Sequence, residues 1–416
     1  MSAIPPQNSD PTRGFSFASL LSDPKYAVFD FGPGDTSALS TDQERQIASH
    51  LMDVLLATFL DKIGFVFQPP SLDKQVHADL ETWTALNMIP LCQGDTRKIE
   101  AVTASMRVAA SISDYFYPHA DRRSRLLIAM ASTAGISLDD FVGEAEMGRF
   151  GSFAYDLLMG NLNFSDAASD GWLGMYTRVM REYVSYFGEG DARVGALGGD
   201  FLVKFLSSTA NEDRFRRLDT LPPHLRPSMS SGESPHGCCP EGFPYWHRYQ
   251  SGASGAYIPP LFRGVPFDYW VTSVPHLVRF TNFTNDLLSF QKEVLGGGGG
   301  ARSFELNYMA LQVLARRQAR VPSQLGPPGS LWTYRDAMRE IMDETHLVVY
   351  ELDKAFVEFP KYVRVCELGR RNGVMMLMNS LADTAMRSGA ASGTWMLLVV
   401  RGRHTRTATY CYTSTR

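Results

Sequence analysis

The sequence is poor in cysteine and lacks the cysteine pairs that zinc and redox sites use. Its 416 residues include five cysteines, an odd number, at Cys92, Cys238, Cys239, Cys366 and Cys411. None of them forms a Cys-x-x-Cys pair, so neither a structural zinc site nor a thioredoxin-like motif is indicated. We therefore expect reduced thiols in a cytoplasmic protein.

An excess of positive charge is also missing. The chain has 40 Lys and Arg residues against 44 Asp and Glu residues, a net charge of −4. Nucleic-acid-binding surfaces usually show a basic excess, so no nucleic-acid partner is expected. No uninterrupted apolar run reaches the roughly 18 residues of a membrane span. The first 13 residues are polar and lack the apolar core of a signal peptide.

Strand-like alternation is scarce, whereas helical periodicity recurs along the chain. Ile47, Leu51, Val54 and Leu55 follow a repeat near 3.6 residues within 43–65. Similar patterns predict helices at 98–116, 122–140, 145–160, 171–187, 197–210, 267–294, 303–318, 332–357 and 361–386. Pro275 is expected to start or kink the helix that contains it. The sequence therefore predicts an all-α fold with helices packed around one interior.

Segments rich in small and polar residues interrupt this pattern without dividing the chain in two. Residues 1–40 are rich in Ser, Pro, Asp and Gly, which predicts a disordered arm. A long loop is expected at 219–245, and the five glycines at 296–300 must end the helix before them. Because composition does not shift across these breaks, we expect a single domain over 41–416.

One segment near the end of a predicted helix carries oxygen donors at helical spacing. Asn285, Ser289 and Glu293 stand at i, i+4 and i+8 in the run NDLLSFQKE, so a regular helix places them on one face. Amide, hydroxyl and carboxylate oxygens suit Mg²⁺. Lys292 is close enough to meet an adjacent phosphate group.

The alternative for this segment is a polar stripe on a solvated helix. Leu287, Leu288 and Phe290 argue against it, because they indicate a mostly buried helix. Buried polar side chains need partners. A metal site is therefore the favoured interpretation.

A second acidic group follows an apolar helical run upstream. Asp139 and Asp140 end the stretch LLIAMASTAGISL, and Glu144 comes one predicted helical turn after Asp140. Carboxylates at such a helix end favour metal binding, although solvated acids at a helix end would give the same pattern. Asp139 is the first candidate ligand, with Asp140 and Glu144 as further candidates.

Between the two groups, Arg248 and Gly252 have the spacing R-x-x-x-G after the long loop. An arginine suits phosphate because its planar guanidinium donates two parallel hydrogen bonds and stays charged. A surface arginine near a turn is the alternative interpretation.

Together these motifs resemble fungal class I sesquiterpene cyclases of the trichodiene synthase family. NDLLSFQKE is similar to that family's Asn-Asp-x-x-Ser-x-x-Lys-Glu motif, and the order of the three motifs over 100–295 agrees with it. The resemblance implies a helical bundle around a central active-site cavity. It further implies three Mg²⁺ ions held by the acidic group and by Asn285, Ser289 and Glu293.

The same resemblance implies roles for the remaining site residues. Arg248 and Lys292 would contact the substrate diphosphate, and Asp286 would support the site from beside the ligand face. A carbonyl at a helix break near Gly252 would help trigger ionisation. The family's Arg-Tyr pair near the carboxyl end is not found after Trp395, where Arg401 and Arg403 stand instead, so the closing of the site departs from the pattern.

The implied activity is that of a lyase of secondary metabolism, in sesquiterpene biosynthesis. It would ionise a prenyl diphosphate, foremost farnesyl diphosphate, and cyclise the carbocation to a hydrocarbon or alcohol. A homodimer is one option for its assembly. A prenyl-chain elongating synthase would carry two DDxxD clusters instead. The other alternative is a catalytically degenerate helical scaffold.

Other chemistries have no motif in the chain. The sequence contains no HExxH, no GxSxG and no phosphate-binding GxxxxGK[ST] loop.

Overall fold

The computed structural model describes residues 16–33, 35, 39–63, 72–117, 120–141, 144–161, 171–218, 242–251, 253–295 and 307–357. Within those ranges the elements are α-helices, short 3-10 helices and one π-helical turn, and β pairing is limited to an isolated bridge between Pro322 and Leu331. The predicted all-α fold class is confirmed. In this part of the chain no helix is long and apolar enough to cross a membrane.

The α-helices lie in the following order along the chain. They are α1 (Phe17–Leu21), α2 (Asp42–Lys62), α3 (Lys74–Asn87), α4 (Thr96–Phe116), α5 (Arg122–Phe141), α6 (Glu144–Leu158), α7 (Gly171–Phe187), α8 (Ala192–Leu218), α9 (Phe243–Ser251), α10 (Val274–Phe290), α11 (Tyr308–Gln318) and α12 (Tyr334–Val357). The 3-10 helices are η2 (Pro24–Phe29), η3 (Ile89–Cys92), η6 (Ala253–Tyr257), η7 (Pro259–Phe262), η8 (Phe267–Tyr269) and η9 (Val271–Ser273), and η10 (Gln291–Leu295) is the π turn.

Most predicted helices are present, whereas α1, α3 and α9 were missed. Pro275 lies in the first turn of α10 and starts it, where a missing backbone N–H costs nothing. The helix α3 was missed because its buried residues form a narrow stripe of Val76, Leu80 and Thr84. The predicted helix at 361–386 and the carboxyl-terminal tail lie outside the described residues.

The amino-terminal segment corrects the prediction of a disordered arm over residues 1–40. Phe17, Tyr26 and Phe29 are fully buried, in and around α1 and η2. The backbone N–H of Phe17 donates to Asp343 at 2.9 Å, which ties α1 to α12. Burial of these aromatic rings offsets the entropy of ordering this segment, so residues 16–33 belong to the fold. Residues 1–15 lie outside the described part.

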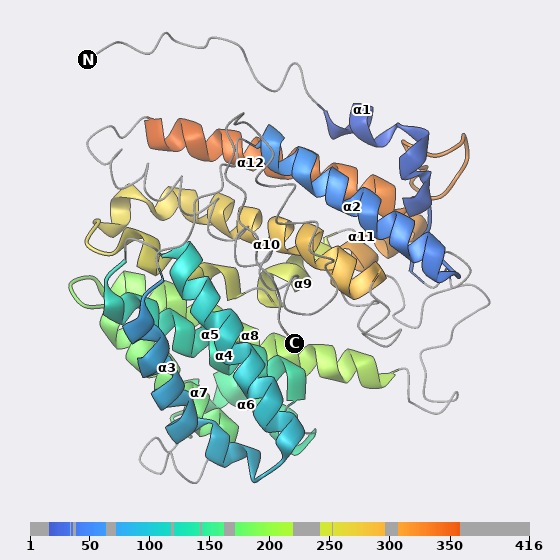
Figure 1. Cartoon of the computed structure of the whole chain (residues 1–416). Coiled ribbons are helices and arrows are strands. Elements are labelled where there is room, and N and C mark those ends of the chain that lie inside the picture. The colour runs from blue at the N-terminus through green and yellow to red at the C-terminus, as the bar shows by residue number, and fades with distance from the viewer. Residues whose placement is uncertain are drawn as a thin grey trace, which may run out of the picture.

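The helices form two adjoining groups (Figure 1). Helix α10 packs along α12, and α1 and η2 also contact α12. In the other group α4 packs on α5, α5 on α7, and α8 on both α6 and α7. The 3-10 helix η6 contacts α8 and α10, so it joins the two groups.

Of the five cysteines, Cys92 is described, and it is a buried free thiol in η3. Burial raises the pKa of this thiol above its usual value, which keeps it protonated and unreactive. The prediction of reduced thiols holds for this residue, and the other four cysteines lie outside the described part.

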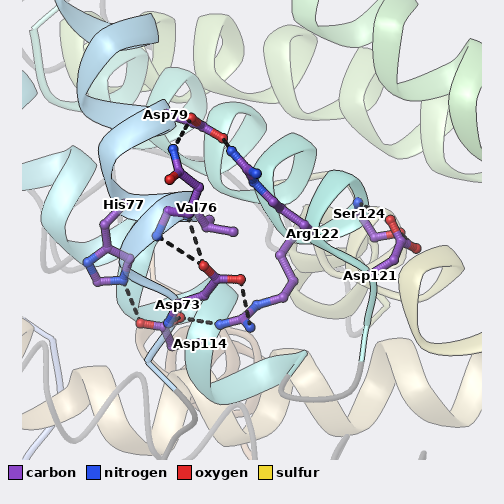
Figure 2. Close-up of polar contacts among 10 residues, drawn as sticks. Asp73, Val76, His77, Asp79, Asp114, Asp121, Arg122 and Ser124 are labelled. Atoms are coloured by element: carbon purple, nitrogen blue, oxygen red, sulfur yellow. Dashed lines mark hydrogen bonds and ion pairs between the residues drawn. The ribbon is translucent and has the colours of Figure 1, made fainter.

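A fully buried carboxylate joins α3, α4 and α5. Asp114 has no solvent exposure, and Nε2 of His77 lies 2.6 Å from its Oδ2. The guanidinium of Arg125, itself buried, pairs with its other oxygen, and the backbone N–H of Asp73 approaches at 3.4 Å. Figure 2 shows the His77 ring turned toward Asp114, with Asp73 beside them. The end of α4 is thereby fastened to the starts of α3 and α5.

We predict that Asp114→Ala destabilises the protein by about 3–5 kcal/mol, because it leaves the Arg125 charge buried without its main partner. Asp79→Ala is the matched control, since Asp79 pairs with Arg122 in the same region but both side chains are partly exposed. Urea unfolding monitored by circular dichroism measures both variants. Equal midpoints for the two variants would contradict a structural role for the buried carboxylate.

Candidate active site

Helix α10 carries the described part of the predicted metal motif. Asn285 and Ser289 are both partly buried and stand one turn apart on this helix, as predicted. The Ser289 hydroxyl has a long contact of 3.5 Å with the backbone carbonyl of Asp286. Two side chains with oxygen atoms that could bind a metal ion therefore lie near the carboxyl end of α10.

The α-helical geometry that the sequence predicts over 285–293 ends at Phe290. Residues 291–295 form the π turn η10, in which hydrogen bonds run from i to i+5 and each turn holds more residues. The simple i, i+4, i+8 spacing therefore does not extend to Glu293. The side chains of Lys292 and Glu293 lie outside the described residues, so their roles stay predictions. Such π turns are frequent at functional sites.

Arg248 on α9 is brought directly onto α10. Its Nε lies 2.9 and 3.0 Å from the two carboxylate oxygens of Asp286. Its Nη2 donates to the amide oxygen of Asn285 at 2.7 Å. The structure thus places two residues predicted from separate motifs in direct contact. Asp286, expected to support the site, holds the Arg248 guanidinium.

The upstream acids lie at the junction of α5 and α6. Asp139 and Asp140 lie in the last turn of α5, whereas Glu144 begins α6, and residues 142–143 between the two helices are outside the described part. The structure therefore places Asp140 on α5 and Glu144 on α6, and whether they act together stays a prediction. The three side chains are not among those described.

The described side chains include only part of the predicted set of metal ligands. Among the described side chains, no three His, Cys, Asp or Glu residues gather in a way that would hold an ion. Asp139, Asp140, Glu144 and Glu293 fall outside the described side chains, so the ligand assignment remains a prediction.

Helix α9 ends one residue before Gly252, near which the resemblance implies a helix break. Helix α9 ends at Ser251 and η6 begins at Ala253, with Gly252 between them outside the described residues. Phe201 of α8 contacts both sides: its ring centroid is 5.4 Å from that of Tyr249, and a Cβ on Gly255 would lie 2.0 Å from its Cδ2. The absence of a side chain at Gly255 therefore lets η6 pack directly against the Phe201 ring.

Two buried side chains next to the site were missed by the sequence-based prediction. Burial lowers the pKa of His247 to about 4, and the adjacent Arg248 charge acts in the same direction. Tyr308, at the start of α11, stacks on Phe283 with ring centroids 5.4 Å apart. Burial raises the pKa of Tyr308, as do the nearby charges of Glu344 and Asp286. Neither residue belongs to a motif, so only the packing of α9 and α11 reveals them.

Comparisons with known proteins leave the family of the chain open. No family model matches the sequence, and no curated protein matches it. Among the solved structures, the chain is similar to one of a single-substitution variant of cucumene synthase. The identity is 13%, the TM-score is 0.47, and the match covers 76% of this chain and 99% of that chain. A likeness at this level does not identify an activity.

We predict that His247 makes folding stability depend on pH. Its pKa of about 4 in the folded state is below the usual 6.5, so the unfolded chain binds the proton more tightly. Stability from this residue is complete above about pH 6.5 and is lost as the pH falls toward 4, by about 2–3 kcal/mol. His247→Asn should flatten this part of the profile of unfolding free energy against pH.

The control is His50→Asn, which replaces an exposed histidine of α2. This variant should give the same profile of unfolding free energy against pH as the wild type. Because the carboxylates titrate in both proteins, their contribution cancels in the comparison. If His247→Asn and wild type lose stability in parallel between pH 6.5 and 4, the burial of a neutral His247 is refuted.

Proposed function

We propose that this chain is a magnesium-dependent class I terpene cyclase. It ionises a prenyl diphosphate, with farnesyl diphosphate as the expected substrate, and cyclises the resulting carbocation to a sesquiterpene hydrocarbon or alcohol. The observation that carries the proposal is the contact between Arg248 and Asn285, 2.7 Å apart on two different helices. It brings an arginine, a side chain that commonly binds phosphate, into contact with Asn285, a candidate magnesium ligand.

The donors on α10 fit magnesium chemically. Asn285 supplies an amide oxygen and Ser289 a hydroxyl, both hard oxygen ligands of the kind that Mg²⁺ takes together with waters and phosphate oxygens. Both side chains are partly buried, so part of each remains exposed to solvent. Asp139, Asp140, Glu144 and Glu293 complete the set by resemblance. Magnesium, when bound, would offset the negative charge of the departing diphosphate.

The residues of the chain would then bind, orient and shield the substrate. Arg248 would donate to diphosphate oxygens, because Asp286 already holds its guanidinium at the edge of α10. Lys292 would add a second positive charge to the leaving group. Closely packed aromatic and aliphatic side chains would exclude water, so that the carbocation is not quenched.

The proposal includes a single cyclase domain over 41–416 that also incorporates residues 16–33. This extension is supported by the ties of the amino-terminal segment to α12, such as the hydrogen bond from Phe17 to Asp343. A cytoplasmic location and a homodimeric assembly are part of the same proposal.

We predict that purified protein converts farnesyl diphosphate with Mg²⁺ to a volatile terpene, detected by gas chromatography–mass spectrometry of the headspace. Asn285→Ala should lower kcat by about 10²–10³-fold, the effect of removing one group that stabilises developing charge. Asn87→Ala is the control: it removes an amide that bonds within α3, from Asn87 to the Trp83 carbonyl at 2.8 Å.

Two outcomes would favour the alternatives. A longer prenyl diphosphate formed only with added isopentenyl diphosphate would identify an elongating synthase. No turnover of C10, C15 or C20 diphosphates, with or without isopentenyl diphosphate, would favour a helical scaffold.

A further inference from the structure

The short helix after α9, η6, ends in two backbone carbonyls that are bound by phenol groups. The hydroxyl of Tyr183 donates to the carbonyl of Ala256 at 2.6 Å. The hydroxyl of Tyr117 donates to the carbonyl of Tyr257 at 2.7 Å. Carbonyls at a helix end have no partner within the helix, and here side chains from distant elements supply one.

These phenols come from two different helical segments of the group that contains α4 to α8. Tyr183 lies on α7, and Tyr117 is the residue that directly follows α4. Both side chains are almost completely buried. Burial raises the pKa of each phenol well above its usual value, so each remains a protonated hydrogen-bond donor at neutral pH.

The close packing around Tyr183 leaves its ring little room to move. A Cβ on Gly198 of α8 would lie 2.4 Å from Cε1 of the ring. On the other side of η6, the Tyr257 hydroxyl lies 3.1 Å from the Ser132 hydroxyl of α5. Together with Phe201, which touches Gly255, these contacts hold η6 from α4, α5, α7 and α8.

Resting on the proposed function, we propose that Tyr117 and Tyr183 are positioning residues of the cyclase. By binding the last two carbonyls of η6, they fix the segment that follows the end of α9 at Ser251. Arg248 stands on α9, in contact with Asn285. The two phenols thus set where η6 lies relative to α9 and α10, the two helices that carry the proposed diphosphate-binding residues. They do not touch the substrate themselves.

The position of this segment matters for the reaction because a misplacement of about 1 Å in a reactive geometry can lower a rate by about 10²-fold. Loss of one phenol hydroxyl would leave a carbonyl of η6 without its partner and let the segment shift. Such a shift should change kcat and the proportions of products, because both depend on how the substrate chain lies when ionisation begins. It should change KM less, because Arg248 stays in place.

The experiment compares Tyr117→Phe and Tyr183→Phe with Tyr176→Phe in the full-length protein. Tyr176 is the matched control: it is a buried phenol on α7 like Tyr183, but its hydroxyl donates to the Leu202 carbonyl of α8 at 3.1 Å. Hydrogen exchange of the peptide 253–258 should be faster by roughly tenfold in the first two variants and unchanged in the control. Their kcat with farnesyl diphosphate and Mg²⁺ should fall by about 10–100-fold, with altered product proportions.

The proposal is overturned if the control changes exchange and products as the two variants do, or if exchange in 253–258 stays at the wild-type rate. If the wild-type protein turns over no prenyl diphosphate, the proposed function fails instead. The exchange comparison then still decides whether the phenols hold η6.

Discussion

The pairing of Arg248 with Asp286 and Asn285 is the interaction on which the candidate site depends. It joins α9 to α10 through a charge-assisted contact in which the Arg248 side chain is 15% exposed and Asp286 8%. Withdrawing both charges from water is costly, so a pair of this kind adds little net stability. Its effect is geometric: it fixes a guanidinium beside an amide oxygen at the edge of a helix. In the proposed function, this guanidinium would also bind the diphosphate oxygens.

Contacts from other helices support the position of α9 and of η6, which follows it. Asp114 and Tyr117 stand near the end of α4, so the buried pair with Arg125 and the phenol contact to η6 act on the same part of that helix. Phe201 then contacts η6 and α9 together. The segment after Ser251 is therefore positioned by contacts from α4 and α8. Rigid support of this kind is what a site needs to hold a reactive geometry.

Most of the helices were predicted from the sequence, because helical periodicity depends on local spacing. Asn285 and Ser289 were identified from residue types at helical intervals, whereas Arg248 was assigned through the family resemblance. The π turn at 291–295 was not predicted, because the sequence pattern of an α-helix continues through it.

Contacts between distant segments were beyond prediction from one sequence. Tyr117 and Tyr183 have no motif around them, and their roles emerge only when α4 and α7 pack against η6. The burial of Phe17, Tyr26 and Phe29 was not predicted, because the surrounding composition is typical of a disordered arm. In each case tertiary packing, rather than local preference, decides the outcome.

Binding of inorganic diphosphate, followed by isothermal titration calorimetry with and without Mg²⁺, tests most directly whether α9 and α10 form a diphosphate-binding wall. We predict saturable binding that requires Mg²⁺ and is weakened at least about tenfold in Arg248→Ala, the effect of losing a charge-assisted hydrogen bond. Binding that is absent in the wild type, or that is indifferent to both Mg²⁺ and Arg248, would contradict the proposed site.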